Sequence, residues 1–285
     1  MFFSFRTREA WPLVCAHRGA RSIAPENTLA AAKAGLAAGA DFWELDVQMT
    51  ADGELVVHHD DELTRTTDAA VRAELTHLAP YRADALALNE IRQLDAGSWF
   101  VDRDPYGTIA TGEVEAPDAL RGVHVPTLRE ALIFSRDNAF PVNIEIKDHA
   151  GRPGDATVTD KIIDCVRELG MPRMVLLSSF NHGYLRRARE LAPEIPRGVL
   201  VEGSLPEAPV RYAADLGAAA FHPDHTLLVP ILVSAFRAAG IAVNTWTVNG
   251  EDRAEELAAM GVNALITDWP QRFVPYLQGW EGTPS

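Results

Sequence analysis

Cysteine is scarce in this sequence: 285 residues contain only Cys15 and Cys165. One lies in an apolar run and the other in a helical pattern, which is not the framework of a disulfide-stapled secreted domain. We therefore interpret both as buried free thiols in a reducing compartment. The N-terminal residues lack the continuous apolar core and the small-residue cleavage site of a signal peptide. We expect a cytoplasmic protein.

Long apolar runs and excess positive charge are also missing. No run approaches the roughly 20 apolar residues of a membrane-spanning helix, so we expect no stable membrane anchoring. The 26 Lys and Arg residues face 40 Asp and Glu residues, which gives a formal net charge of −14. Such a charge repels nucleic acid and anionic membrane surfaces, so an anionic substrate would need local cations to bind.

Short β-rich runs alternate with helical patterns almost throughout. We expect strands at Leu13–Ala16, Phe42–Gln48, Val142–Lys147, Val175–Ser179, Gly198–Val201, Ala219–His222, Val243–Val248 and Ala264–Thr267. We expect helices near Thr28–Ala38, Leu128–Ser135, Thr157–Leu169, Tyr184–Leu191, Ala208–Leu216, Val229–Ala238, Arg253–Met260 and Gln271–Leu277. This α/β alternation implies a parallel sheet, and its eight repeats predict a TIM (β/α)₈ barrel. A doubly wound open sheet is the alternative, disfavoured because no G-x-G-x-x-G follows the first strand.

One connection is longer than the others. The segment between Asp60 and Pro126 carries Pro, Gly and charged residues, with one short helix expected at Ala83–Leu94. Loops of this length in compact domains usually have a function. We predict a single barrel domain over residues 1–285 with an inserted subdomain at about 61–125 that overhangs the C-terminal end of the strands. Its aromatic residues either line the overhang or form a small core: Trp99, Phe100 and Tyr106.

Acidic residues share the inward face of two expected strands. Glu44 and Asp46 are two residues apart, as are Glu145 and Lys147, and residues two apart in a strand point the same way. The apolar residues between them must then face the helices outside the barrel. Three carboxylates converging in a cavity of low dielectric constant repel one another strongly.

A divalent cation would relieve this repulsion. Oxygen ligands alone favour Mg²⁺ or Ca²⁺ over zinc, so we predict such a metal on Glu44, Asp46 and Glu145. The alternative is a network of buried ion pairs with Lys147 and Arg18. We favour the metal because two cations cannot easily satisfy three carboxylates and also bind a substrate.

Two histidines end strands on opposite walls of the same expected pocket. His17 follows the first strand, and His59 follows the extension beyond the second. Such a pair suits general acid and general base roles. Arg18 offers a planar fork for two phosphate oxygens, and Lys147 adds a point charge. A metal, an acid, a base and two cations are the parts needed to cut a phosphodiester.

Other positions are ambiguous. Trp246 is expected to point inward, either as a pocket wall or as barrel packing. Asn27, Thr28 and Asp268 are interpreted as helix-capping residues. His222 could contact a substrate head group, whereas His58 should face away from His59.

Short motifs follow one another in a recognisable order. They include His17–Gly19, Pro25–Thr28, Glu44–Val47, His59–Asp60, Leu63–Thr67, Asn143–Lys147, Thr245–Val248 and Ile266–Pro270. Each is weak alone, but their order and spacing resemble the glycerophosphodiester phosphodiesterase family over nearly the whole chain. The resemblance implies a TIM barrel with an insertion that hydrolyses small-molecule glycerophosphodiesters to glycerol 3-phosphate and an alcohol.

The resemblance also assigns roles to residues. It implies that His17 and His59 are the acid–base pair, that the three carboxylates hold the metal, and that Arg18 and Lys147 contact the phosphate. We expect a monomer or homodimer. Two alternatives remain: a phospholipase D-like hydrolase of lysophospholipid or sphingomyelin, and a non-catalytic binding module on the same barrel.

Overall fold

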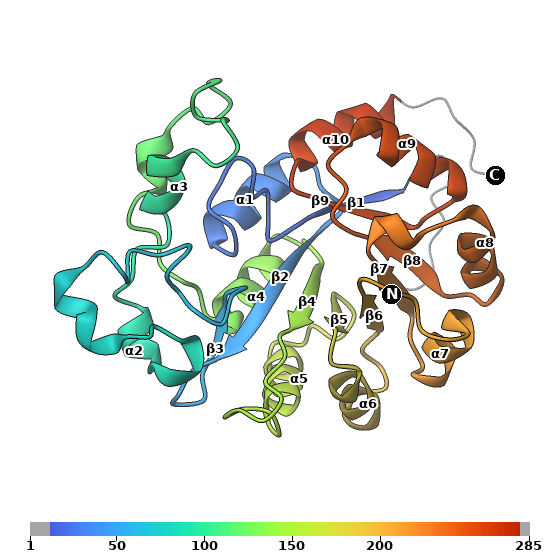
Figure 1. The fold of residues 1–285 in the computed structure, drawn as a ribbon, viewed down its shortest axis with the longest axis horizontal. Helices are drawn as coiled ribbons and strands as arrows, with labels where there is room; N and C mark the ends of the chain where they lie inside the picture. The colour runs from blue at the N-terminus through green and yellow to red at the C-terminus, as the bar shows by residue number, and fades with distance from the viewer. Residues whose placement is uncertain (1–11, 280–285) are drawn as a thin grey trace.

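Eight parallel strands close into a barrel in the computed structural model, which describes residues 12–279. β1 pairs with both β2 and β9, and this double pairing closes the sheet (Figure 1). The TIM-barrel prediction is confirmed, and the open-sheet alternative is wrong. The barrel strands are β1 (Leu13–Ala16), β2 (Phe42–Met49), β4 (Val142–Ile146), β5 (Val175–Ser179), β6 (Arg197–Val201), β7 (Ala220–Pro223), β8 (Ala242–Thr245) and β9 (Ala264–Thr267).

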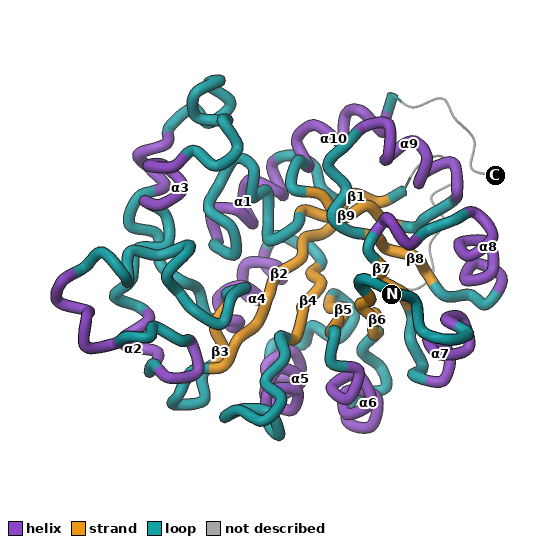
Figure 2. Tube along the Cα trace, in the orientation of Figure 1, coloured by secondary structure: helices purple, strands orange, loops and turns teal. Residues whose placement is uncertain are grey.

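Helices surround this barrel (Figure 2). Their positions agree with the sequence patterns, with ends that differ by a few residues. They are α1 (Leu29–Ala37), α4 (Leu128–Asp137), α5 (Val158–Glu168), α6 (His182–Leu191), α7 (Pro209–Asp215), α8 (Pro230–Ala238), α9 (Glu251–Met260) and α10 (Pro270–Gln278). None of the helices described is long and apolar enough to cross a bilayer.

The apolar residues that alternate with the charged ones pack outward, as expected. Leu45, Val47, Ile144 and Ile146 join a buried cluster with residues of α4 and α5. This packing leaves the other face of β2 and β4 directed into the barrel. Both cysteines are free: Cys15 is buried, and Cys165 is only half-buried.

The apolar extension before His59 forms a ninth strand, whose antiparallel pairing the sequence patterns did not predict. β3 (Leu55–Val57) folds back antiparallel on the end of β2, with Val47 opposite Val57. The turn between them needs Gly53, whose φ is +81°, a conformation that glycine adopts without a steric penalty. The hairpin carries the chain back over the end of β2 and brings His59 to the barrel mouth.

The long connection contains short helices and a core of its own. These are η1 (Ala73–Leu78), η2 (Ala83–Ala85), α2 (Leu88–Ile91), α3 (Ser98–Arg103) and η3 (Pro117–Leu120). The single helix expected at Ala83–Leu94 is wrong, because a break separates η2 from α2. A buried cluster that includes Leu63, Ile91 and Leu94 supports the segment.

The insertion packs beside the barrel, at the left of Figure 1. Trp99 packs edge-on against the buried Phe100, whereas Tyr106 packs against Trp269, which precedes α10. Thr108 Oγ1 donates to the Ser22 carbonyl at 2.6 Å. The segment is thus attached to the loops that follow β1 and β9. Its status as a separate subdomain stays a prediction.

Candidate active site

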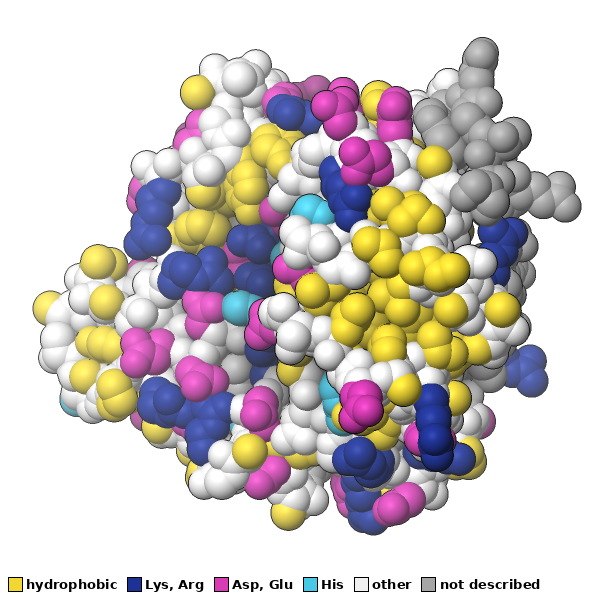
Figure 3. All heavy atoms as spheres, turned by 45° about the vertical axis from the view of Figure 1, so that its right-hand side comes forward, with side chains coloured by type: hydrophobic (Ala, Val, Ile, Leu, Met, Phe, Trp, Pro, Cys, Tyr) yellow, Lys and Arg dark blue, Asp and Glu magenta, His cyan; other side chains and the backbone are white. Residues whose placement is uncertain are grey.

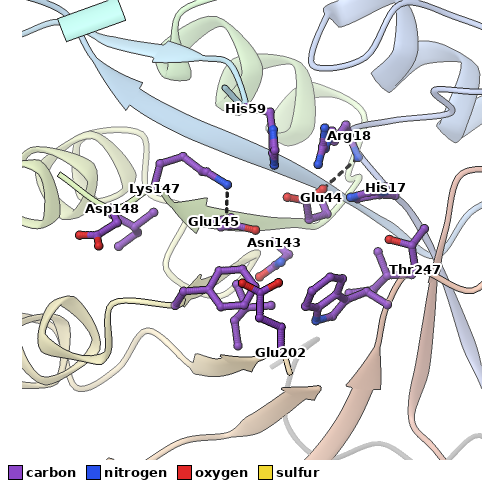
Figure 4. Close-up of a pocket in the computed structure, with 15 residues that line it drawn as sticks. His17, Arg18, Glu44, His59, Asn143, Glu145, Lys147, Asp148, Glu202 and Thr247 are labelled. Carbon is purple, nitrogen blue, oxygen red and sulfur yellow. Dashed lines mark hydrogen bonds and ion pairs between the residues drawn. The ribbon is translucent and has the colours of Figure 1, made fainter. Parts of the chain in front are cut away.

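Strand register brings the predicted acidic residues together. β2 lies next to β4, with Glu44 opposite Asn143 and Asp46 opposite Glu145. One carboxylate oxygen from each of Glu44, Asp46 and Glu145 lies within 4.8 Å of the others. Figure 4 shows Glu44 and Glu145 side by side in the pocket.

These carboxylates are not equivalent electrostatically. Burial raises the pKa of Glu44 well above its usual value, and the charges of Asp46 and Glu145 raise it further. Burial and Asp46 raise the pKa of Glu145 as well. Burial would also raise the pKa of Asp46, but Lys147 and Arg18 hold it well below its usual range.

The ion-pair network is present but incomplete. Lys147 Nζ lies 2.7 Å from Glu145 Oε1 and 3.4 Å from Asp46 Oδ1. Arg18 Nε lies 3.3 Å from Asp46 Oδ2. Within residues 12–279, no lysine or arginine side chain forms an ion pair with Glu44.

Glu44 therefore has a free acceptor. Its Oε2 accepts a hydrogen bond from the Arg18 backbone N–H at 2.9 Å, but its buried Oε1 has no partner among the described residues. An unpartnered buried carboxylate oxygen is costly. The three-carboxylate set therefore fits a hard divalent cation, and ion pairing alone does not account for it.

Asn27 orients one of these carboxylates. Its Nδ2 donates to Asp46 Oδ2 at 2.8 Å, and its Oδ1 accepts from the Asp46 backbone N–H at 3.2 Å. The helix-cap interpretation is confirmed for Thr28, which caps α1 by accepting from Ala31 N–H, and is wrong for Asn27. The local sequence resembled a cap, and the true partner lies on the next strand.

Each histidine is anchored by a carboxylate. His17 Nδ1 lies 2.7 Å from Asp268 Oδ1, and His59 Nδ1 lies 2.6 Å from Asp60 Oδ1. Both rings line the same pocket (Figure 4). With Nδ1 engaged in each ring, Nε2 is the nitrogen left to act on a ligand.

Asp268 is not the helix cap that its position suggested. α10 begins at Pro270, and Trp269 occupies the cap position. The Asp268 carboxylate instead holds His17, and its Oδ2 accepts from Asn249 Nδ2 at 2.9 Å. Burial lowers the pKa of His17, and Arg18 adds to this effect, while Asp268 opposes it.

A buried glutamate connects Arg18 to the His59–Asp60 pair. Glu26 accepts from Arg18 Nη1 at 2.8 Å and from Arg65 Nη2 at 2.7 Å, and its Oε2 lies 2.7 Å from Arg21 Nη2. Arg65 Nε also contacts Asp60 Oδ2 at 2.5 Å. The partner of His59 is thereby tied to the glutamate that holds Arg18.

Burial would raise the pKa of Glu26, but the hydrogen bond from Arg65 and the charges of Arg18 and Arg21 hold it far below its usual range. Glu26 thus keeps its negative charge despite its burial. Glu26 and Arg65 both lie within the sequence motifs, but their contact was not predicted. No spacing rule relates the two positions, because Arg65 belongs to the insertion.

The pocket has a volume of about 400 Å³. His17, Arg18, His59 and Lys147 line one part of it, together with the carboxylates. The sequence patterns favoured a packing or turn role for Phe180, which lines the pocket, and they missed other lining residues, among them Asn143, Asp148, Leu200, Glu202 and Thr247. Asn143 could have been found, since it stands two residues before Glu145 on the same strand face.

Trp246 lines this pocket, as one of its two interpretations predicted. Its Nε1 donates to the His222 carbonyl at 2.9 Å, which holds the indole in place. His222 itself is fully buried against Asn244, and burial lowers its pKa to about 3, so it is a packing residue. His58 is buried too and points away from His59, with Nε2 3.2 Å from the Glu62 carbonyl.

Comparisons with known proteins agree with this geometry. Residues 17–272 match the glycerophosphoryl diester phosphodiesterase family model. A glycerophosphodiester phosphodiesterase of Caldanaerobacter subterraneus subsp. tengcongensis is 35% identical over 263 residues, covering 92% of this chain and 96% of that protein.

Solved structures are similar as well. An Oleispira antarctica phosphodiesterase in complex with the product sn-glycerol-3-phosphate superposes with a TM-score of 0.78 and 30% identity, covering 94% of this chain and 98% of that one. A glycerophosphodiester phosphodiesterase from Agrobacterium tumefaciens gives a TM-score of 0.73 and 29% identity, covering 93% and 99%. The chain therefore belongs to the glycerophosphoryl diester phosphodiesterase family of phosphoric diester hydrolases.

Proposed function

We propose that this protein hydrolyses glycerophosphodiesters to glycerol 3-phosphate and an alcohol, with the help of a divalent cation. The family supports the reaction class. The observation that carries the proposal is the placement of two carboxylate-anchored histidines and three converging carboxylates around one pocket.

The acidic residues would hold the cation. Glu44, Asp46 and Glu145 supply only oxygen ligands, which favours Mg²⁺ or Ca²⁺. When bound, the ion would neutralise charge on the phosphate and assist ionisation of the nucleophile. Asn27 would keep the Asp46 carboxylate in its binding orientation.

The remaining charged residues would bind and orient the phosphate. Arg18 and Lys147 lie beside the carboxylates and line the pocket. Inside the pocket, their positive charge offsets the protein's overall negative charge. An anionic diester would therefore enter and be held beside the carboxylates.

The histidines would move the protons. Nε2 of one ring accepts the proton of the nucleophile, which is water or the glycerol 2-hydroxyl, as its oxygen bonds to phosphorus. Nε2 of the other ring donates a proton to the alcohol oxygen as the P–O bond breaks. Attack by the 2-hydroxyl would give a cyclic phosphate that water then opens. Asp268 and Asp60 stabilise the positive charge that each ring carries when protonated.

A substrate panel tests the proposal. Glycerophosphodiesters with different alcohols are assayed for released glycerol 3-phosphate, with and without a chelator. We expect turnover that the chelator abolishes and that Mg²⁺ or Ca²⁺ restores. His17→Ala and His59→Ala should each lower kcat by about 10²- to 10⁴-fold, with an unchanged circular dichroism spectrum.

Two results would contradict this assignment. One is near-normal turnover in either histidine variant. The other is metal binding without turnover on any diester, which would favour a binding module. Activity confined to lysophospholipid or sphingomyelin vesicles would favour the phospholipase D-like alternative.

A further inference from the structure

The part of the pocket far from the cations is aromatic and acidic. Phe180 follows β5, Glu202 follows β6 and Trp246 follows β8, and all three line the cavity. Figure 4 shows Glu202 across the pocket from Arg18, His59 and Lys147. The pocket therefore has a cationic end that suits phosphate and a second end with the opposite character.

The rings of Phe180 and Trp246 are perpendicular to each other, and we call this pair the aromatic corner. Their centroids are 5.6 Å apart and their planes meet at 88°. The hydrogen bond from Trp246 Nε1 to the His222 carbonyl fixes the indole. Phe180 is 37% exposed, which is unusual for a large apolar side chain in this protein, so its ring is accessible from the cavity mouth.

Figure 3 shows two kinds of surface on one face of the molecule. Cationic, acidic and histidine side chains gather on one side, and a broad apolar area lies on the other. An alcohol group that leaves the phosphate toward the aromatic corner would thus meet π faces and apolar groups.

The exposed side chain of Glu202 gives this end its charge. Within residues 12–279, no ion pair and no side-chain hydrogen bond involves the Glu202 carboxylate. The basic groups around the pocket, in contrast, each have a carboxylate partner: His17 has Asp268, Arg18 has Glu26, and Lys147 has Glu145. An unpaired carboxylate beside aromatic faces is complementary to an organic cation.

We propose, on the basis of the function proposed above, that Phe180, Trp246 and Glu202 form a subsite for a cationic alcohol head group such as choline. A quaternary ammonium has no N–H donor, so it is recognised by π faces and a nearby negative charge. Arg18 and Lys147 repel the same group, which directs it away from the phosphate end. The neutral glycerol part then lies on the other side, near the buried and unpartnered Asn143 Oδ1.

Two substrates of the same shape, one charged and one neutral, measure the contribution of the head group's positive charge. sn-Glycero-3-phosphocholine is compared with its 3,3-dimethylbutyl analogue, in which carbon replaces the ammonium nitrogen. Wild-type enzyme should show a kcat/KM about 10-fold higher for the choline substrate, the combined size expected for two partly exposed cation–π contacts and a supporting charge.

Two variants locate the effect. Glu202→Gln and Phe180→Leu should each lower this preference by about 2- to 10-fold, by raising KM for the choline substrate and leaving the neutral analogue within about 2-fold. Glu207→Gln is the matched control, since it removes the same charge from an exposed position on the same loop. It should leave the preference unchanged.

The outcomes separate this inference from the function on which it rests. A wild-type ratio near one, or equal effects of Glu202→Gln and Glu207→Gln, would overturn the subsite while both diesters are still hydrolysed. Failure to hydrolyse either diester with metal present would instead overturn the proposed function.

Discussion

His17 and Asp268 lie 251 residues apart in the chain, and their side chains meet at 2.7 Å. The contact follows from barrel closure, because β1 pairs with β9 and each residue comes directly after one of these strands. Asp268 Oδ1 engages Nδ1 of the ring, which fixes the tautomer that presents Nε2 to the pocket. The first and last strands thus build the His17–Asp268 pair, to which the proposed function assigns a catalytic role.

This contact predicts the behaviour of Asp268→Asn. A neutral amide cannot stabilise a protonated ring, so we expect kcat to fall by about 10²-fold or more. Asp268 does not line the pocket, so KM should change by less than about 3-fold. Steady-state kinetics with a thermal unfolding control measures both. A kcat within about 2-fold of wild type would show that His17 does not depend on this partner.

The Asn27–Asp46 contact predicts a loss of metal affinity. Asn27→Gly removes the amide that holds Asp46 and tolerates the positive φ of 57° at this position. Loss of a group that orients a ligand typically weakens metal binding by about 10- to 100-fold. Isothermal titration with Mg²⁺ or Ca²⁺ measures the change.

Ala139→Gly is the control for this variant, since Ala139 also has a positive φ (51°) and lies on an exposed turn. Its metal affinity should equal that of wild type. An Asn27→Gly protein with wild-type affinity would remove Asn27 from the metal site.

Glu26 predicts a pH-dependent stability. Because the pKa of Glu26 is lowered in the folded state, its stabilisation is fully present above the unfolded-state value of about 4.5 and is lost as the pH falls through the folded-state pKa. Glu26→Gln should lower the free energy of unfolding by about 3 kcal/mol near neutral pH, since it leaves buried arginines without their counter-charge.

The difference between wild type and Glu26→Gln should therefore shrink below about pH 4.5. Urea unfolding at several pH values measures it. The exposed Glu207→Gln serves as the reference, with an expected change within about 0.5 kcal/mol. A pH-independent difference would mean that packing, and not charge, explains the effect of Glu26.

Because one Glu44 oxygen has no partner in the part of the chain that the structure describes, we expect Glu44→Gln to have opposite effects on stability with and without bound metal. Glu44→Gln removes a repelling charge, so the metal-free variant should be at least as stable as metal-free wild type. Wild type should gain about 2.7 kcal/mol at a metal concentration 100 times Kd, and the variant should lose this gain. Thermal unfolding with and without Mg²⁺ or Ca²⁺ provides the comparison. A metal-induced rise in Tm that survives in the variant would exclude Glu44 as a ligand.

Local periodicity was enough to predict the barrel and its inward carboxylates. Glu44 and Asp46 had to share a face because side chains alternate along a strand, and the apolar residues between them had to face the helices. Trp246 was ambiguous for the same reason, since alternation gives its face but not its neighbours.

Residues that act through a distant partner could not be predicted in this way. Asn27 and Asp268 both resembled helix caps, because the polar groups that cap a helix are also those that orient a ligand or a histidine. Their partners, Asp46 and His17, become visible only when strands are neighbours in space. The contacts of Arg65 could not be predicted without knowing where the insertion runs relative to the barrel.

The sequence by itself determined which side chains could perform acid–base and metal chemistry and which way each strand would present them, because these properties depend on residue type and on a two-residue repeat. Only the tertiary structure decided which of them meet. Barrel closure and strand register set those contacts, and they depend on the packing of the whole chain and not on any local stretch.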